Sequence, residues 1–354
     1  MSRPAARGLR PRLGSGLPLA RDPLRRDRAR GTSAPARAPG APLDLPALPR
    51  SREDVEVSSF GRVLTAMATP MSPARDLDLD GAQRLAAHLV DNGSDGIVVA
   101  GTTGESPTLS HHETLELFSA VVKAVGDRAH VIAGCGKNDT AATVELSREA
   151  AQRGVSGILL VSPYYNRPSQ RGLLTHFATA AAATDLPVML YDIPSRCAVE
   201  IAGDTLLRLA ETVPNIRAVK DATGNFAKAA RVAASAPDGF EIFSGDDAAL
   251  LPLLAVGGVG VVSVAAHLVG RELADMIESF PTDPARSRRI HHRLLPLFSA
   301  LFCDSNPVPL KAGLDLLGLP GGPVRPPLAT ADQGVIDTMR TTMTELGLLD
   351  AAER

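Results

Sequence analysis

One lysine and three tyrosines stand out as side chains that could carry out chemistry. The chain has only three tyrosines, and Tyr164, Tyr165 and Tyr191 all lie in two polar segments that follow short apolar runs. Lys220, one of five lysines, lies within another such run, 216–221. Burial lowers the pKa of a lysine from ~10.4, so more of its amine is neutral at pH 7 and able to attack a carbonyl carbon. We therefore predict that Lys220 forms a Schiff base with a carbonyl substrate.

Schiff-base formation needs a group that moves protons, because water must leave the carbinolamine intermediate. Tyr191 lies near the end of the preceding apolar run, 187–192, and is the candidate for this proton transfer. The alternative interpretation is purely structural: Lys220 would pair with a carboxylate such as Asp221, and the tyrosines would pack in the core. Both interpretations place the lysine at the end of a buried strand.

Two further features are suited to binding acidic groups. The turn GTTGES, 101–106, combines glycines that allow close backbone approach with the hydroxyls of Thr102 and Thr103. Arg196 has a planar guanidinium that can pair with a carboxylate. Two such features around one amine indicate a keto acid and a second acidic carbonyl compound as substrates. The alternatives are helix capping by the threonines and a surface ion pair for the arginine.

Eight short apolar runs alternate with stretches of 10 to 20 residues that have helical periodicity. This order predicts an α/β protein with a (β/α)8 TIM barrel, whose active site lies at the carboxyl ends of the strands. An open, doubly wound sheet is the competing fold. It would require a glycine-rich turn after the first strand, and that turn is absent. The predicted strands are 63–68, 96–101, 130–134, 157–163, 187–192, 216–221, 240–246 and 259–264.

The chain divides into three predicted regions. Residues 1–58 form a basic extension, because 1–50 contain eleven arginines against three aspartates, a net charge of +8 in a chain of net charge −2. We expect this extension to be disordered; a transit peptide or a nucleic-acid-binding arm are alternatives, and we favour an inert segment and no nucleic-acid partner. Residues 59–283 form the catalytic barrel. Residues 284–354 form a C-terminal appendage with three helical stretches.

Composition excludes several other classes of protein. A hydrophobic fraction of 44% with 21% charged residues excludes a disordered or collagen-like chain. Segment 248–270 is uncharged and long enough to cross a bilayer, but Pro252 and several glycines favour a helix, a turn and a buried strand, so we expect no membrane partner. Three widely spaced cysteines favour a reducing, cytoplasmic location.

No metal and no cofactor are expected. Three cysteines at wide spacing do not form a zinc cage, and the zinc-binding pattern HExxH is absent. His111 and His112 follow Ser110, which has the capping-box spacing to Glu113, so these histidines are predicted at a helix start.

Seven motifs, in this order and spacing, resemble the 4-hydroxy-tetrahydrodipicolinate synthase (dihydrodipicolinate synthase) family. The resemblance extends from about Gly61 to the C-terminus. It implies a pyruvate-dependent class I aldolase barrel that needs no cofactor. Such an enzyme condenses pyruvate with L-aspartate 4-semialdehyde to give 4-hydroxy-tetrahydrodipicolinate, in lysine and diaminopimelate biosynthesis. The motifs are GTTGES, PYYNRPSQ, LYDIPSR, AVKDATG, SGDD, GGVGVVSV and SNPVPLK.

The resemblance also implies a role for each candidate site residue and a homotetramer built from tight dimers. Lys220 matches the Schiff-base lysine. The proton relay would consist of Tyr191, Thr102 and Tyr165, the last of which would reach across the tight dimer interface into the neighbouring site. The residues matched to substrate binding are Thr103 for the pyruvate carboxylate, Arg196 for the semialdehyde carboxylate, Gly245, and Val262 beside the keto acid.

Sister families and departures from the family pattern qualify these expectations. The N-acetylneuraminate lyases and 2-keto-3-deoxy sugar acid aldolases share the lysine and Tyr191; Arg196 favours the synthase, and a catalytically silent barrel is a third interpretation. Cys197 and Ala198 replace the usual threonine and glycine after Arg196. Family members inhibited by lysine carry a histidine and a glutamate where this chain has Thr114 and Ala142. We therefore predict weak or absent inhibition by lysine.

Overall fold

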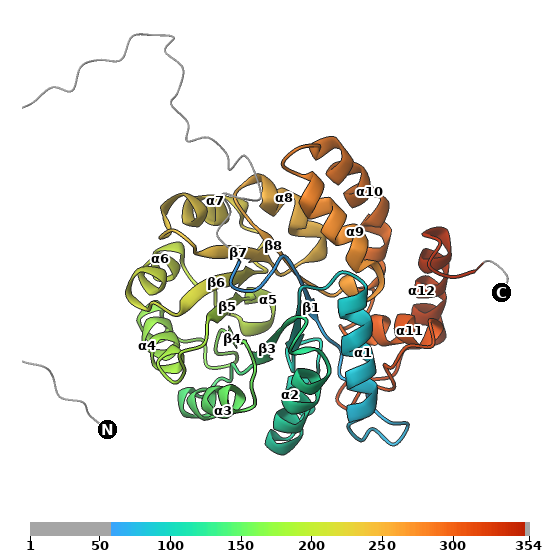
Figure 1. Ribbon diagram of the computed structural model, residues 1–354, viewed down its shortest axis with the longest axis horizontal. Coiled ribbons are helices and arrows are strands. Elements are labelled where there is room, and N and C mark those ends of the chain that lie inside the picture. The colour runs from blue at the N-terminus through green and yellow to red at the C-terminus, as the bar shows by residue number, and fades with distance from the viewer. Residues whose placement is uncertain (1–57, 351–354) are drawn as a thin grey trace, which may run out of the picture. The chain divides into compact units, whose positions relative to one another are not determined.

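A closed barrel of eight parallel strands forms the centre of the computed structural model, which describes residues 58–350 (Figure 1). Each strand pairs with the next along the chain, and β8 pairs with β1. The predicted TIM barrel is therefore confirmed, and every predicted apolar run contains one strand. The strands are β1 (Val63–Ala66), β2 (Gly96–Val99), β3 (His130–Gly134), β4 (Gly157–Val161), β5 (Val188–Asp192), β6 (Ile216–Asp221), β7 (Glu241–Ser244) and β8 (Gly260–Ser263).

Helices surround this barrel, as Figure 1 shows. The three predicted C-terminal helices are present as α10, α11 and α12; α10 packs on α9, and α12 packs on both α10 and α11. The helices are α1 (Leu79–Asp91), α2 (His111–Val125), α3 (Thr140–Gln152), α4 (Gln170–Ala181), α5 (Pro194–Cys197), α6 (Gly203–Thr212), α7 (Phe226–Ser235), α8 (Leu250–Ala255), α9 (Ala266–Ser279), α10 (Pro284–Ala300), α11 (Val308–Leu316) and α12 (Gln333–Glu345), with 3-10 turns at Ser106–Thr108 and Asp247–Ala249.

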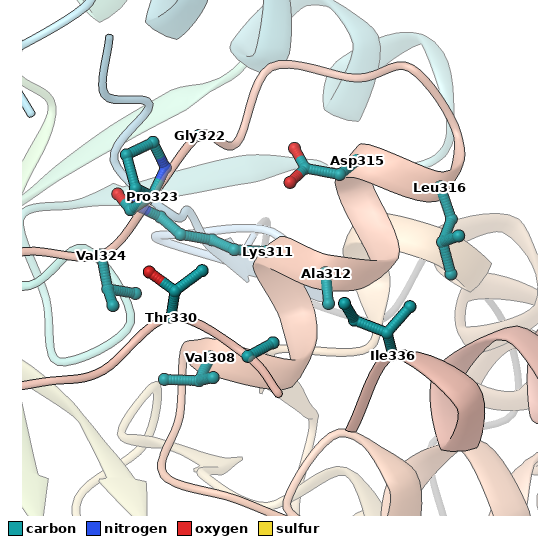
Figure 2. Close-up of a pocket in the computed structure, with 11 residues that line it drawn as sticks. Val308, Lys311, Ala312, Asp315, Leu316, Gly322, Pro323, Val324, Thr330 and Ile336 are labelled. Atoms are coloured by element: carbon teal, nitrogen blue, oxygen red, sulfur yellow. The ribbon is translucent and has the colours of Figure 1, made fainter. Parts of the chain in front are cut away.

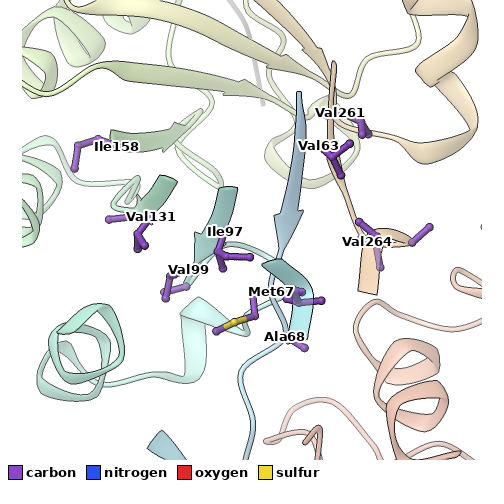
Figure 3. Packing of buried hydrophobic residues seen from close by; sticks show 14 of the residues in the cluster. Val63, Met67, Ala68, Ile97, Val99, Val131, Ile158, Val261 and Val264 are labelled. Carbon is purple, nitrogen blue, oxygen red and sulfur yellow. The ribbon is translucent and has the colours of Figure 1, made fainter. Parts of the chain in front are cut away.

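The strands are apolar on both faces because each face is buried. Successive side chains of a strand point to opposite faces. On β2, Val98 belongs to the cluster inside the barrel, whereas Ile97 and Val99 belong to the layer between barrel and helices. Figure 3 shows this outer layer, in which Val63 and Val261 lie close together on neighbouring strands. The sequence of a parallel strand that is covered on both faces is therefore a continuous apolar run.

The same alternation determines which polar side chains enter the barrel. Ala218 of β6 and Met189 of β5 belong to the interior cluster. Two residues further along each strand, Lys220 and Tyr191 lie on the same inner face. Asp221, the next residue of β6, lies on the opposite face, toward the helices.

The structure also describes segment 248–270, the cysteines and the start of α2. Segment 248–270 contains helix α8, a turn, strand β8 and the start of α9, as predicted. Within 58–350, no helix is long and apolar enough to cross a membrane. All three cysteines are free thiols. Ser110 and Glu113 form the predicted capping box at the start of α2. The predicted extension 1–58 lies almost wholly outside the described residues.

Candidate active site

Lys220 lies inside the barrel at the carboxyl end of β6, directly beside Tyr191 of β5. The two residues are register partners, and Lys220 Nζ lies 4.2 Å from the centroid of the Tyr191 ring. Burial lowers the pKa of Lys220 to about 7; the negative charge of Asp247 opposes this shift, and the positive charge of Arg196 adds to it. At pH 7 about half of such amines are neutral, against about 0.04% for an unperturbed lysine. The amine is therefore a competent nucleophile.

Tyr191 is held as a neutral phenol. Its side chain is almost fully buried, and burial raises its pKa above the ordinary value, while the charge of Arg196 and a hydrogen bond with the Thr102 side chain oppose that rise. A protonated phenol beside an amine can donate a proton and take it back. The predicted pair Tyr191 and Thr102 is thus brought together at Lys220.

The turn GTTGES is tightly built. Ala100 and Glu105, at its two ends, have left-handed backbone with φ of 53° and 55°. Such residues cost of order 1–3 kcal/mol each and persist where surrounding contacts impose them. The turn also runs so close to β3 that a Cβ on Gly134 would lie 2.4 Å from the carbonyl oxygen of Ala100. The buried Thr103 accepts a hydrogen bond of 3.0 Å from Asn306 Nδ2 through its hydroxyl oxygen.

Arg196 lies on α5, a single helical turn that directly follows β5. Arg196 is exposed, whereas the next residue, Cys197, is buried. Ala198 ends the turn with a left-handed φ of 56°, and its N–H donates to the carbonyl of Pro194 at 2.8 Å. This is the position at which the family usually has glycine, so this chain keeps the same turn with a strained alanine.

Gly245 directly follows β7 and lies against Lys220, and Val262 is part of β8. A Cβ on Gly245 would lie 3.1 Å from Lys220 Cγ and Cε, so the glycine leaves room for the lysine side chain. Val262 of β8 is buried in the interior cluster. Both predicted residues therefore line the barrel interior or its mouth.

Tyr165 is the one predicted catalytic residue that lies away from Lys220 within this chain. Its side chain is 91% exposed, and its φ of 71° is left-handed. The loop between β4 and α4 thus presents a large aromatic side chain to its surroundings.

Asp247 lies close enough to Lys220 to affect its pKa, although the sequence did not single it out within the motif SGDD. Its carboxylate is almost fully buried and accepts hydrogen bonds from the Ser263 hydroxyl and from the N–H groups of Val264 and Ala265. Its charge raises the pKa of Lys220, against the effect of burial. The motif SGDD contains Asp247, but its hydrogen-bond partners come from β8 and the segment after it, which the motif does not indicate.

Asp192 and Asp221 lie side by side on the outer face of the barrel wall, next to Tyr191 and Lys220 in the sequence. Lys228 Nζ of α7 lies 2.8 Å from Asp192 Oδ2 and 3.8 Å from Asp221 Oδ2, and 3.0 Å from Glu200 Oε1. Burial raises the pKa of Asp192 to about 6, and the charge of Lys228 opposes the rise. The alternative that Lys220 pairs with Asp221 is therefore wrong, because that carboxylate contacts Lys228.

Replacing Lys228 with methionine should destabilise the protein strongly, because two buried carboxylates would lose their cation. We expect the free energy of unfolding at pH 8 to fall by about 3–5 kcal/mol. The loss should be smaller at pH 5, since an unpaired, buried Asp192 binds a proton more readily as the pH falls. Urea denaturation measures both values.

Arg231→Met is the matched control, because Arg231 lies on the same helix and forms an ion pair with the exposed Asp204. Such surface pairs contribute at most about 1 kcal/mol. Equal losses in the two variants would contradict the role assigned to Lys228.

Among residues 58–350, no group of three or more histidine, cysteine, aspartate or glutamate side chains is arranged to hold a metal ion.

Comparisons with known proteins agree with this architecture. The model of the dihydrodipicolinate synthetase family matches residues 59–346. The 4-hydroxy-tetrahydrodipicolinate synthase of Moorella thermoacetica is 55% identical over 291 residues, which are 82% of this chain and 99% of that protein. The corresponding protein of Symbiobacterium thermophilum is 51% identical over 292 residues, with 82% and 99% covered.

A solved structure gives the same result. The crystal structure of DHDPS from Cyanidioschyzon merolae with lysine bound superposes with a TM-score of 0.81 at 47% identity, covering 82% of this chain and 100% of that one. The fold, the order of the motifs and the relatives agree, and the chain belongs to the dihydrodipicolinate synthetase family.

Proposed function

We propose that the protein is a Schiff-base-forming lyase that condenses pyruvate with L-aspartate 4-semialdehyde to give 4-hydroxy-tetrahydrodipicolinate. The observation that carries this proposal is the buried Lys220 amine, with a pKa near 7, against the ring of Tyr191. The curated relatives at about 50% identity bear the name of this synthase. The reaction belongs to lysine and diaminopimelate biosynthesis.

The chemistry follows from the amine. Neutral Lys220 attacks C2 of pyruvate, and the carbinolamine loses water to form the Schiff base. Loss of a proton from C3 gives an enamine, which forms a carbon–carbon bond to the aldehyde carbon of the semialdehyde. The amino group of that substrate then attacks C2, closes the ring and releases Lys220. Overall, two substrates give one product and one water.

Each remaining site residue receives a role in this scheme. Tyr191, hydrogen-bonded with Thr102, moves protons to and from the carbinolamine. The hydroxyl of Thr103, with the N–H groups of its turn, binds the pyruvate carboxylate. The exposed Arg196 on α5, just after β5, binds the semialdehyde carboxylate. Gly245 and Val262 shape the space around the bound keto acid.

The first test is reduction with borohydride in the presence of pyruvate. A peptide map should show the reduced pyruvate adduct on Lys220, and the Lys220→Arg variant should show none. Because burial lowers the pKa of this amine, the trapping rate should rise with pH and level off above about 7. An adduct on another residue, or an inflection near 10, would contradict the proposal.

The second substrate is tested by comparing aldehydes in the presence of pyruvate. Aspartate semialdehyde should give turnover, whereas N-acetylmannosamine and glyceraldehyde should not. Preference for either of the latter would favour the sister lyases or aldolases.

We further propose that Tyr165 completes the proton relay of a neighbouring subunit, within a tight dimer that assembles into a homotetramer in the cytoplasm. Its 91% exposure supports this, because a relay residue cannot act from open solvent. An isologous dimer would place the Tyr165 side chain of each subunit at the other's site.

Mixing two inactive variants tests this arrangement. Tyr165→Phe lacks the relay tyrosine, and Lys220→Arg lacks the nucleophile. A mixed dimer has one complete site, so an equal mixture of refolded subunits should recover about a quarter of the wild-type activity. No recovery in dimers shown to be mixed would contradict a role across the interface.

Inhibition by lysine should be weak. Thr114 is buried and donates its hydroxyl hydrogen to the Ser110 carbonyl, and Ala142 offers no carboxylate to an effector ammonium group. A titration of activity with L-lysine should show little effect, and Ala142→Glu should increase the inhibition. An inhibition constant in the low micromolar range for the wild type would contradict this prediction.

A further inference from the structure

We propose that the C-terminal segment 306–325 positions the substrate-binding turn 101–106, and that Lys311 and Asn306 are positioning residues for the reaction. The proposal rests on the proposed function, since Thr102 and Thr103 of this turn are assigned there to the relay and the pyruvate carboxylate. It concerns residues outside the barrel that touch no substrate.

The central contact is an ion pair between the turn and α11. Lys311 Nζ lies 2.6 Å from Glu105 Oε1, and the exposed fractions of the two side chains are 4% and 1%. Lys311 also donates a hydrogen bond of 3.0 Å to the carbonyl of Pro323. The other oxygen, Glu105 Oε2, accepts a hydrogen bond of 2.8 Å from the backbone N–H of Arg325. Both carboxylate oxygens are therefore held by residues of the C-terminal segment.

A second contact reaches the threonine itself. Asn306 Nδ2 donates to Thr103 Oγ1 at 3.0 Å, and both residues are buried. Arg325 extends the connection to the start of α2, because its guanidinium donates to the Thr108 carbonyl and to Glu113. Four residues within 101–113 are thus joined to one segment more than 190 positions away in the sequence.

The backbone of the turn explains why such contacts are needed. Glu105 adopts the left-handed conformation although it has a side chain. This conformation persists only if other contacts impose it, and the ion pair acts on that very residue. Two residues away, the Thr103 hydroxyl must face the bound carboxylate with an accuracy that loose packing does not supply.

Lys311 also lines a pocket beside α11. A cavity of about 350 Å³ lies there, lined by Val308, Asp315 and Thr330 among others (Figure 2). Figure 2 shows Lys311 extending from α11 toward Gly322 and Pro323. The Lys311 amine itself is almost fully buried, and its contacts are the Glu105 carboxylate and the Pro323 carbonyl. A buried ion pair is a poor source of stability compared with apolar packing, which is consistent with a role in placement.

The decisive variants are Lys311→Met and the double variant Glu105→Gln with Lys311→Met. The single change leaves a buried carboxylate without its cation and should destabilise the protein. The double change removes both charges, so the fold should recover. Each protein is assayed for borohydride trapping of pyruvate on Lys220, which counts working nucleophiles. The kinetic constants are then expressed per trapped site.

We expect the double variant to trap pyruvate on Lys220 with the wild-type pH inflection, while kcat/KM per site falls by about 10- to 100-fold. Asn306→Ala should raise the KM for pyruvate and leave the trapping inflection unchanged. Lys123→Met, an exposed lysine on α2, is the matched control and should retain wild-type constants.

The outcomes separate the two proposals. If the double variant recovers both stability and wild-type kcat/KM per site, the ion pair is structural only and this inference is wrong. If wild-type protein itself fails to trap pyruvate on Lys220, the proposed function fails instead.

Discussion

Burial of the Lys220 amine, which leaves much of it neutral near pH 7, is the interaction on which the proposed chemistry depends. Water stabilises an ammonium group so well that only its exclusion brings the pKa of Lys220 down to about 7. The barrel supplies that exclusion, because its interior is filled by apolar side chains below the lysine and by Tyr191 beside it. Asp247 and Arg196 then adjust the pKa in opposite directions. Burial is the larger effect, so the fold itself keeps a large fraction of this amine neutral and able to act as the proposed nucleophile.

Other charged side chains support the elements around the buried Lys220 amine. The supporting charges are themselves buried, and each is matched by a partner on another element. Lys228 of α7 holds the carboxylates behind β5 and β6, and Lys311 of α11 holds the carboxylate of the strained turn after β2. A buried ion pair contributes little net stability. Removing one partner leaves an unpaired buried charge and is costly, so the two side chains keep a single arrangement. The proposed reacting groups thus lie at the mouth of a barrel whose strand ends form ion pairs with the helices outside it.

Much of this could be predicted from the sequence because it depends on local pattern. The eight apolar runs predicted the strands, since a strand buried on both faces must be apolar along its length. The capping box at Ser110 is a relation between residues three apart, and it was predicted for that reason. Lys220 could be singled out because it is a charged residue near the end of the largely apolar run 216–221. The alternative in which Lys220 pairs with Asp221 is wrong, because adjacent residues of a strand face opposite sides and Asp221 contacts Lys228.

The sequence by itself determined the order of elements, the barrel and the place of the proposed nucleophile along the chain, because periodicity and strand ends depend on neighbouring residues. Tertiary structure alone decided the contacts around the proposed site: Asp247 with Ser263, Thr103 with Asn306 and Glu105 with Lys311. The last two join residues about 200 positions apart, and no local pattern indicates which distant amide or amine will lie opposite. The C-terminal segment brings these two pairs together when it packs against the turn after β2, and the packed barrel interior lowers the pKa of Lys220.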